Sequence, residues 1–164
     1  MLKFVLGIAI VAFCTFCGYL LSKKYRKRKV FFTELYGFNE RFLTEIAYYR
    51  RPIMEWLSQN TFKQEFGLLV QLYAEQTTQN LSIQGIVSEN ADFAFLAKDE
   101  KSYVENYFSM LGKGDSLSQK NYFSASKEQL DTWRKKAETD AKKYVDLYVK
   151  VGFLFGLFIL ILIV

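Results

Sequence analysis

The stretch FVLGIAIVAFCTFCGYLL, residues 4–21, is followed after one serine by the run KKYRKRK, residues 23–29. The first stretch has 18 residues without a charge or a proline. A helix of that length is about 27 Å long, close to the roughly 30 Å thickness of a bilayer core. The sequence therefore predicts a transmembrane helix over residues 1–22 that ends at a basic flank over residues 23–29.

A second uncharged stretch covers residues 151–164. Its 14 residues are too few to cross a bilayer core as a straight helix. We therefore expect the second transmembrane helix to include preceding residues and to cover 146–164. Lys150 would then extend its ammonium group toward the lipid headgroups.

The cations beside the apolar stretches predict the topology. Cytoplasmic flanks of transmembrane helices are rich in Lys and Arg, and lysines also precede the second stretch. Both flanks predict termini outside the cell membrane and a cytoplasmic region between the two helices. A cleaved signal peptide is the rival explanation of the first stretch, but a stop-transfer run follows it instead of a small-residue cleavage site. The topology-determining residues are Lys23, Lys24, Arg26, Lys27, Arg28 and Lys29.

The net charge of +5 comes from this basic flank. Lys3 and the flank contain seven of the 22 Lys and Arg residues. The other 15 cations are accompanied by all 17 acidic residues, which leaves a net charge of −2. The basic composition is therefore a topological signal, and no nucleic-acid partner is predicted.

Few residues could carry catalysis or bind a metal. The sequence has no histidine, the commonest general base and metal ligand. Its only cysteines, Cys14 and Cys17, lie within the first apolar stretch, where apolar packing is favoured over redox or zinc chemistry. We expect no enzyme activity, no catalytic residue, no cofactor and no metal.

Residues 30–145 are expected to form one cytoplasmic helical domain, so the predicted fold class is all-α. Apolar residues recur in steps of three and four before Pro52, which is typical of a helix with one buried face. Similar patterns predict helices near residues 53–57, 62–73 and 98–111, whereas residues 75–97 show no clear pattern. The first apolar stripe consists of Phe31, Leu35, Phe38, Phe42, Ile46 and Tyr49.

The segment GKGDS, residues 112–116, predicts a break before the last helix. Asp115 or Ser116 can cap that helix, and Gln119 stands at the reciprocal position of a capping box built on Ser116. No proline or glycine follows until Gly152. We expect this helix to continue into the second span as one rod, the alternative being a bundle helix followed by an independent span.

The corner at Pro52 carries candidate interaction residues. Tyr48 and Trp56 are near it in sequence, and aromatic residues are enriched at binding hot spots, although core packing explains most aromatics. Glu45 lies beside Ile46 of the apolar stripe, where an unpaired carboxylate would be costly. We therefore expect a partner for it, such as Arg41 or another subunit.

Four segments resemble the stage III sporulation protein AB family of endospore-forming bacteria. Lys3, Gly7 and Gly18 open the first span as in that family. EIAYYRRPIMEWL, residues 45–57, is similar to its Glu-Ile-x-Tyr-Gly-x-x-Pro-Leu-x-Glu-x-Leu block. LGKGDSLSQ, residues 111–119, resembles its Leu-Gly-x-Ser-Asp-x-x-x-Gln motif, and YVKVGFLFGL, residues 148–157, its Tyr-x-x-Leu-Gly-x-x-x-Gly-Leu run. Departures are Tyr49 in place of Gly and Gly114 in place of Ser.

The resemblance implies a helical domain like that of the inner-membrane platform protein of type II secretion systems. It also implies a scaffold subunit in the mother-cell membrane around the forespore, within a secretion-like channel apparatus. Expected partners are the cytoplasmic sporulation ATPase, stage III sporulation protein AA, other membrane components of the complex, membrane lipid and further copies of the chain. A regulatory or adaptor membrane protein unrelated to transport is the alternative. The candidate interaction residues are Glu45, Tyr48, Pro52, Glu55, Trp56, Gly112, Asp115 and Gln119.

Overall fold

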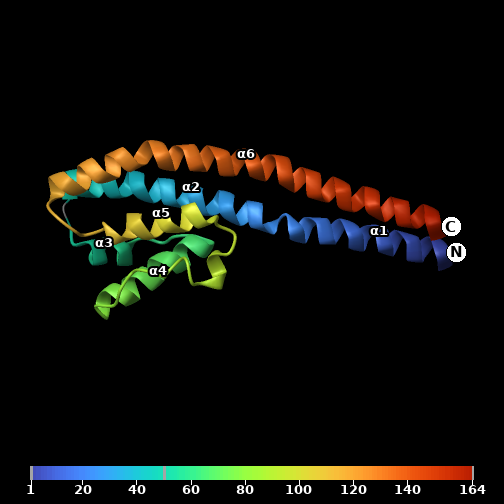
Figure 1. The fold of residues 1–164 in the computed structure, drawn as a ribbon, viewed down its shortest axis with the longest axis horizontal. Coiled ribbons are helices and arrows are strands. Elements are labelled where there is room, and N and C mark those ends of the chain that lie inside the picture. Colours follow the sequence, from blue (N-terminus) through green and yellow to red (C-terminus); the bar gives the residue numbers. More distant parts are fainter. Residues whose placement is uncertain (1, 50, 164) are drawn as a thin grey trace. The chain divides into compact units, whose positions relative to one another are not determined.

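The computed structural model describes residues 2–49 and 51–163, and every regular element in them is helical. The first and last residues of the two expected spans, 1 and 164, lie outside the described residues. The prediction of an all-α fold is confirmed (Figure 1). The elements are α1 (Leu2–Leu21), α2 (Lys23–Thr44), the π-helix η1 (Glu45–Tyr49), α3 (Ile53–Gln59), α4 (Gln64–Thr78), the 3₁₀ helix η2 (Ala91–Phe93), α5 (Lys98–Ser109) and α6 (Ser116–Ile163).

The chain divides into two compact units. Residues 1–29 and 136–164 form one unit, which we call the helix pair. Residues 30–135 form the other, which we call the central domain. Both α2 and α6 contribute residues to each unit, since their bounds cross the divisions at residues 29 and 135.

In the helix pair, α1 and the C-terminal part of α6 run antiparallel and touch through glycines (Figure 1). A methyl group added at Gly152 would lie 2.6 Å from the Cys14 carbonyl oxygen, and one at Gly156 would lie 2.8 Å from Val11 Cα. Gly18 likewise faces the Tyr148 carbonyl. Small residues that let backbones approach this closely are typical of helix packing in membranes.

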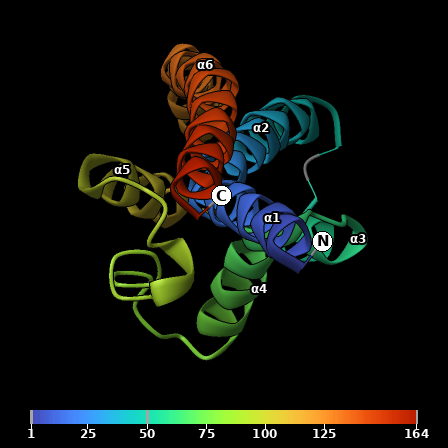
Figure 2. The same ribbon diagram turned by 90° about the vertical axis from the view of Figure 1, so that its right-hand side faces the viewer.

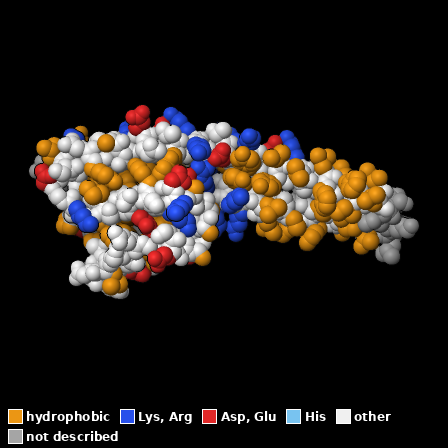
Figure 3. Space-filling view, in the orientation of Figure 1, with side chains coloured by type: hydrophobic (Ala, Val, Ile, Leu, Met, Phe, Trp, Pro, Cys, Tyr) orange, Lys and Arg blue, Asp and Glu red, His pale blue; other side chains and the backbone are white. Residues whose placement is uncertain are grey.

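The outer surface formed by α1 and the C-terminal part of α6 is mostly apolar, as the hydrophobic side chains in Figure 3 show. Two helices of the described residues are long and apolar enough to cross a membrane, one within Leu6–Tyr49 and one within Ser116–Leu162. Large exposed apolar side chains lie on both of them, among them Ile8, Phe13, Leu154, Phe158 and Ile161. Length and composition thus support both predicted apolar helices.

The central domain has a core of aromatic rings around α2. Phe38 is fully buried and its ring lies 5.2–6.2 Å, centroid to centroid, from six other aromatic rings. Those rings come from α2, α3, the segment before α4, α4 itself and α5. Figure 2 labels these four helices in a view turned by 90° from that of Figure 1. Phe42 and Phe32 extend the contacts to Phe123 and Trp133 of α6. The predicted stripe from Phe31 to Phe42 is therefore the buried face of α2.

Hydrogen bonds of two buried side chains, Asn39 and Tyr73, link the core helices. Asn39 is fully buried; its amide nitrogen donates to the Phe123 carbonyl oxygen at 3.1 Å, and its amide oxygen accepts from the Tyr107 hydroxyl at 2.9 Å. The Tyr73 hydroxyl donates to the Leu111 carbonyl oxygen at 3.2 Å. Buried polar groups that are fully bonded fix the positions of the helices that carry them.

Candidate functional site

The two sequence motifs of the central domain meet at one corner. A cavity of about 340 Å³ lies between residues 42–53, at the end of α2, and residues 112–119, at the start of α6. Among its walls are Glu45, Pro52, Gly112 and Gln119, four of the eight candidate interaction residues. We call this region the motif corner.

The π-helix η1 determines which residues face inward at the motif corner. A π turn contains one more residue than an α turn, so it rotates the residues that follow it. Glu45 at the start of η1 is buried and Ile46 is half-buried, whereas Tyr49 at its end is 66% exposed. The prediction that Tyr49 continues the buried stripe is wrong for this reason.

Glu45 is held by Arg51, which follows η1. The Arg51 Nε and Nη2 atoms donate to Glu45 Oε1 and Oε2 at 2.8 and 2.7 Å, and the Arg51 backbone N–H donates to Oε1 at 3.3 Å. These hydrogen bonds lower the pKa of Glu45 below its usual value, although burial opposes the shift. Arg41, named above with another subunit as a possible partner, instead donates to the Gly37 carbonyl oxygen.

The same arginine connects the corner to α3. Arg51 Nη1 donates to Gln59 Oε1, and Gln59 Nε2 donates to Glu55 Oε1 at 3.4 Å. The side chain of Glu55 is exposed. A chain of polar contacts thus runs from the buried Glu45 to the surface of α3.

Tyr48 and Tyr49 are the exposed aromatic residues of the motif corner. The side chain of Tyr48 is 80% exposed, and the Arg51 guanidinium carbon lies 5.3 Å from the centre of the Tyr49 ring. Pro52 is exposed beside them. Trp56, in contrast, is only 3% exposed and packs against Phe38 and Phe42, so its indole belongs to the core.

The second motif forms the turn into α6. Gly112 has φ +72°, a conformation that favours glycine, and a methyl group there would approach Ile53 Cγ2 at 3.2 Å. Asp115 caps the helix, since its Oδ1 accepts from the Ser118 backbone N–H at 3.1 Å. Hydrogen bonding to the Ser118 side chain, and then to this backbone N–H, lowers the pKa of Asp115. Of the two residues predicted to cap α6, Asp115 is the cap in the structure. Gln119 lines the cavity.

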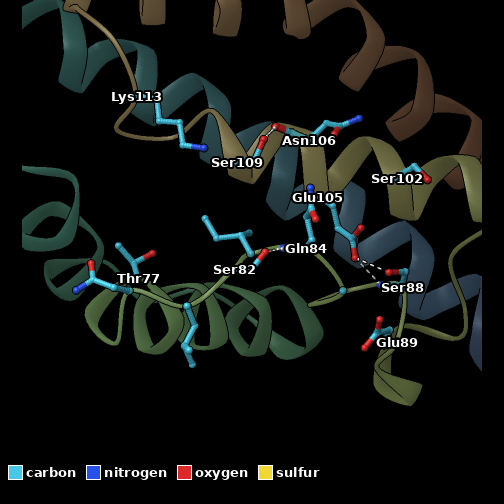
Figure 4. Close-up of a pocket in the computed structure, with 14 residues that line it drawn as sticks. Thr77, Ser82, Gln84, Ser88, Glu89, Ser102, Glu105, Asn106, Ser109 and Lys113 are labelled. Carbon is cyan, nitrogen blue, oxygen red and sulfur yellow. Dashed lines mark hydrogen bonds between the residues drawn. The ribbon is translucent and has the colours of Figure 1, made fainter.

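A larger, polar groove of about 900 Å³ lies elsewhere in the central domain, between the residues after α4 and helix α5 (Figure 4). Glu105 accepts hydrogen bonds from the Val87 and Ser88 backbone N–H groups and from the Ser88 hydroxyl at 2.7–3.0 Å. These bonds outweigh burial, the largest single influence, and lower the pKa of Glu105. The three hydrogen bonds connect Val87 and Ser88, within the stretch 75–97 that shows no clear sequence pattern, to α5. None of the eight candidate interaction residues lines this groove.

The six cations predicted to determine the topology lie at the start of α2, in the helix pair. Lys23 and Lys24 are exposed, and the other four cations are half-buried. No group of three or more Cys, Asp or Glu side chains suited to a metal ion occurs in the described part of the chain. The arrangement at the motif corner, with exposed aromatics beside a rigid ion pair, is suited to protein recognition.

The fold defines an all-helical protein with two helices able to cross a membrane and one small aromatic-cored domain. The chain belongs to the stage III sporulation protein AB family, whose sequence profile matches residues 3–164. This match confirms the resemblance and implies a role in sporulation. No curated protein and no solved structure matches the chain.

Proposed function

We propose that the protein is a membrane-anchored scaffold subunit of the apparatus that links mother cell and forespore. In this proposal it has no catalytic activity and couples the cytoplasmic ATPase, stage III sporulation protein AA, to membrane components of the same complex. The family supports the sporulation role, and the motif corner supports the scaffold role.

The observation that carries the proposal is the meeting of the two family-like segments, residues 45–57 and 111–119, around one cavity. Tyr48 and Tyr49 are exposed next to it, although large aromatic side chains are favoured in the core of a domain. Exposed aromatics beside polar groups fixed by hydrogen bonds are typical of binding hot spots. The motif corner is thus the proposed ATPase contact.

The proposed anchoring uses both apolar helices. The cations of residues 23–29 favour a cytoplasmic central domain and external termini. We propose that α6 runs from the central domain into the membrane as one helix, so that its Asp115 end and its membrane end belong to one element. A regulatory or adaptor role unrelated to transport needs the same anchors but no ATPase contact.

The test is binding of the full-length protein, purified in a neutral detergent, to purified stage III sporulation protein AA. We expect binding, and we expect Tyr48→Ala with Tyr49→Ala to weaken it at least about tenfold, as truncation of hot-spot aromatics does. The control is Leu81→Ala, which also removes an exposed apolar side chain but lies far from the motif corner in sequence and lines the polar groove. If both folded wild-type proteins fail to bind, the adaptor alternative is favoured.

A further inference from the structure

The positive charge of the protein is concentrated in one part of the helix pair. Residues 23–29 and 136–150 contain ten Lys and Arg residues but three carboxylates, a net charge of +7. We call these two segments the basic collar. The central domain, residues 30–135, contains 11 cations and 14 carboxylates, a net charge of −3. The excess of cations is therefore local.

All three carboxylates of the basic collar are already paired. Arg28 Nη1 lies 2.7 Å from Asp140 Oδ2 and thereby links α2 to α6. Glu138 and Asp146 each pair with the lysine one turn further along α6, Lys142 and Lys150, at 3.1 and 2.6 Å. Each of these three ion pairs uses one cation, so cations outnumber carboxylates in the collar.

Four lysines of the collar face solvent on both segments. Lys23, Lys24, Lys136 and Lys143 are exposed, and in the described part of the chain none of them has a carboxylate within ion-pair distance. Lys24 and Lys143 lie 5.0 and 5.3 Å from the ring centres of the neighbouring Tyr25 and Tyr144. Exposed cations without a carboxylate partner in the protein attract anions from outside it.

Tyrosines place the collar at the end of the apolar surface. The Tyr25 ring stacks on Tyr144 and Tyr148 of α6, with centroids 4.7 and 5.9 Å apart. The Arg26 guanidinium carbon lies 3.6 Å from the centre of the Tyr19 ring, and Arg26 Nη2 donates to the Tyr19 carbonyl oxygen at 2.9 Å. Tyrosine rings gather at the headgroup level of membranes. Figure 3 shows Lys and Arg side chains directly beside the apolar surface.

We propose that the basic collar binds the phosphate groups of anionic phospholipids. This inference rests on the proposed membrane anchoring. A topological signal requires cations in a flank, but it does not require exposed, unpaired lysines on both helices beside a stacked tyrosine cluster. Anionic headgroups would neutralise the exposed charges of Lys23 and Lys24 on one segment and of Lys136 and Lys143 on the other.

The test uses the full-length protein in dodecyl maltoside and counts bound lipids by native mass spectrometry. The probes are phosphatidylglycerol, phosphatidylcholine with the same acyl chains, and water-soluble glycerol phosphate. We expect at least about tenfold tighter binding of phosphatidylglycerol than of phosphatidylcholine, since each lysine near an anionic surface contributes several-fold. Binding of glycerol phosphate as tight as that of phosphatidylglycerol would overturn the lipid assignment.

Matched variants test whether the lysines of the collar, and not the net charge of the whole protein, determine the preference for phosphatidylglycerol. The test variant changes Lys23, Lys24, Lys136 and Lys143 to Gln, and we expect it to lose the preference for phosphatidylglycerol; the same four changed to Arg should retain it. The control variant changes four exposed lysines of the central domain to Gln and should also retain it: Lys63, Lys98, Lys113 and Lys120. Helical content by circular dichroism checks folding.

The outcomes distinguish this inference from the proposed anchoring. Equal binding of the two phospholipids, or equal loss of preference in the test and control variants, would overturn the lipid site while leaving the anchoring intact. A wild-type protein that remains soluble and monomeric without detergent would contradict the anchoring itself.

Discussion

The helix pair and the central domain are built from the same kind of helix but are held together differently. In the central domain, large aromatic rings lie inside, and Phe38 alone contacts six others. In the helix pair, glycines lie inside, as at Gly152 and Gly156, and the large apolar side chains lie outside.

This difference matches the packing expected in two different solvents, water and lipid. In water, burial of large apolar side chains drives packing, so aromatic rings collect in the core. In a bilayer, lipid already solvates apolar side chains, and helices associate by close backbone contact at small residues. The helix pair has the packing expected in lipid, and the central domain has the packing expected in water.

The largest effect is expected from truncation of a large apolar side chain that lies inside the central domain. Phe38→Ala in the central domain should lower the free energy of unfolding by about 3–5 kcal/mol, because it leaves a cavity among buried rings. Phe158→Ala in the helix pair, where the side chain is 60% exposed, should change it by less than about 0.5 kcal/mol. Thermal unfolding of the full-length protein in detergent compares the two, and equal losses would contradict the distinction.

A matched pair of glycine changes tests the close packing. Gly152→Ala places a methyl group against the Cys14 carbonyl and should cost about 1–3 kcal/mol, since the backbone cannot move aside freely. Gly37→Ala in α2 meets no atom within 4 Å and should stabilise the protein by up to about 1 kcal/mol. The same unfolding measurement applies. A gain in stability at both positions would show that the two helices are not in close contact.

The ion pair at the motif corner should make stability depend on pH. The folded-state pKa of Glu45 is lowered, so its contribution is present above the unfolded pKa of about 4.3 and is lost as the pH falls through the folded pKa. Glu45→Gln should therefore be less stable than wild type at pH 7, with the difference shrinking below about pH 4. Glu55→Gln, at an exposed carboxylate, serves as the control. A difference independent of pH would contradict a role for the charge.

The smallest effect is expected at the start of α6. Asp115→Ala removes the cap on the Ser118 N–H and should slightly lower the unfolding temperature, whereas Asp115→Asn keeps an acceptor oxygen and should stay near wild type. The ATPase affinity of both variants is measured alongside. Lost affinity in Asp115→Ala at unchanged stability would make this residue part of the interface.

The apolar pattern was sufficient to predict most helices of this fold. The stripe from Phe31 to Phe42, the break at Pro52 and the turn at Gly112 each follow from strong local signals, and the structure has all three. Residues 75–97 gave no such signal. Residues 75–78 continue α4, and the Val87 and Ser88 amides donate to the carboxylate of Glu105, which follows them in sequence.

The candidate site was only partly predictable. The resemblance to the family identifies the two motifs that contain Glu45, Pro52, Gly112 and Gln119, but nothing local indicates that they share a cavity. Glu45 pairs with Arg51, which follows η1 in the chain, and not with Arg41 on the preceding turn of α2. Asn39 was missed because a single polar residue on a helix gives no sign of its partners Tyr107 and Phe123.

Thiol labelling of the full-length protein in intact cells tests the two surroundings most directly. With Cys14 and Cys17 replaced by Ala, single cysteines are introduced as Leu81→Cys in the central domain and Phe13→Cys in the helix pair, both exposed positions. A membrane-impermeant maleimide should label Leu81→Cys only after the cells are permeabilised, and Phe13→Cys only after the protein is denatured. Labelling of Leu81→Cys in intact cells, or equally fast labelling of both after permeabilisation, would contradict the account.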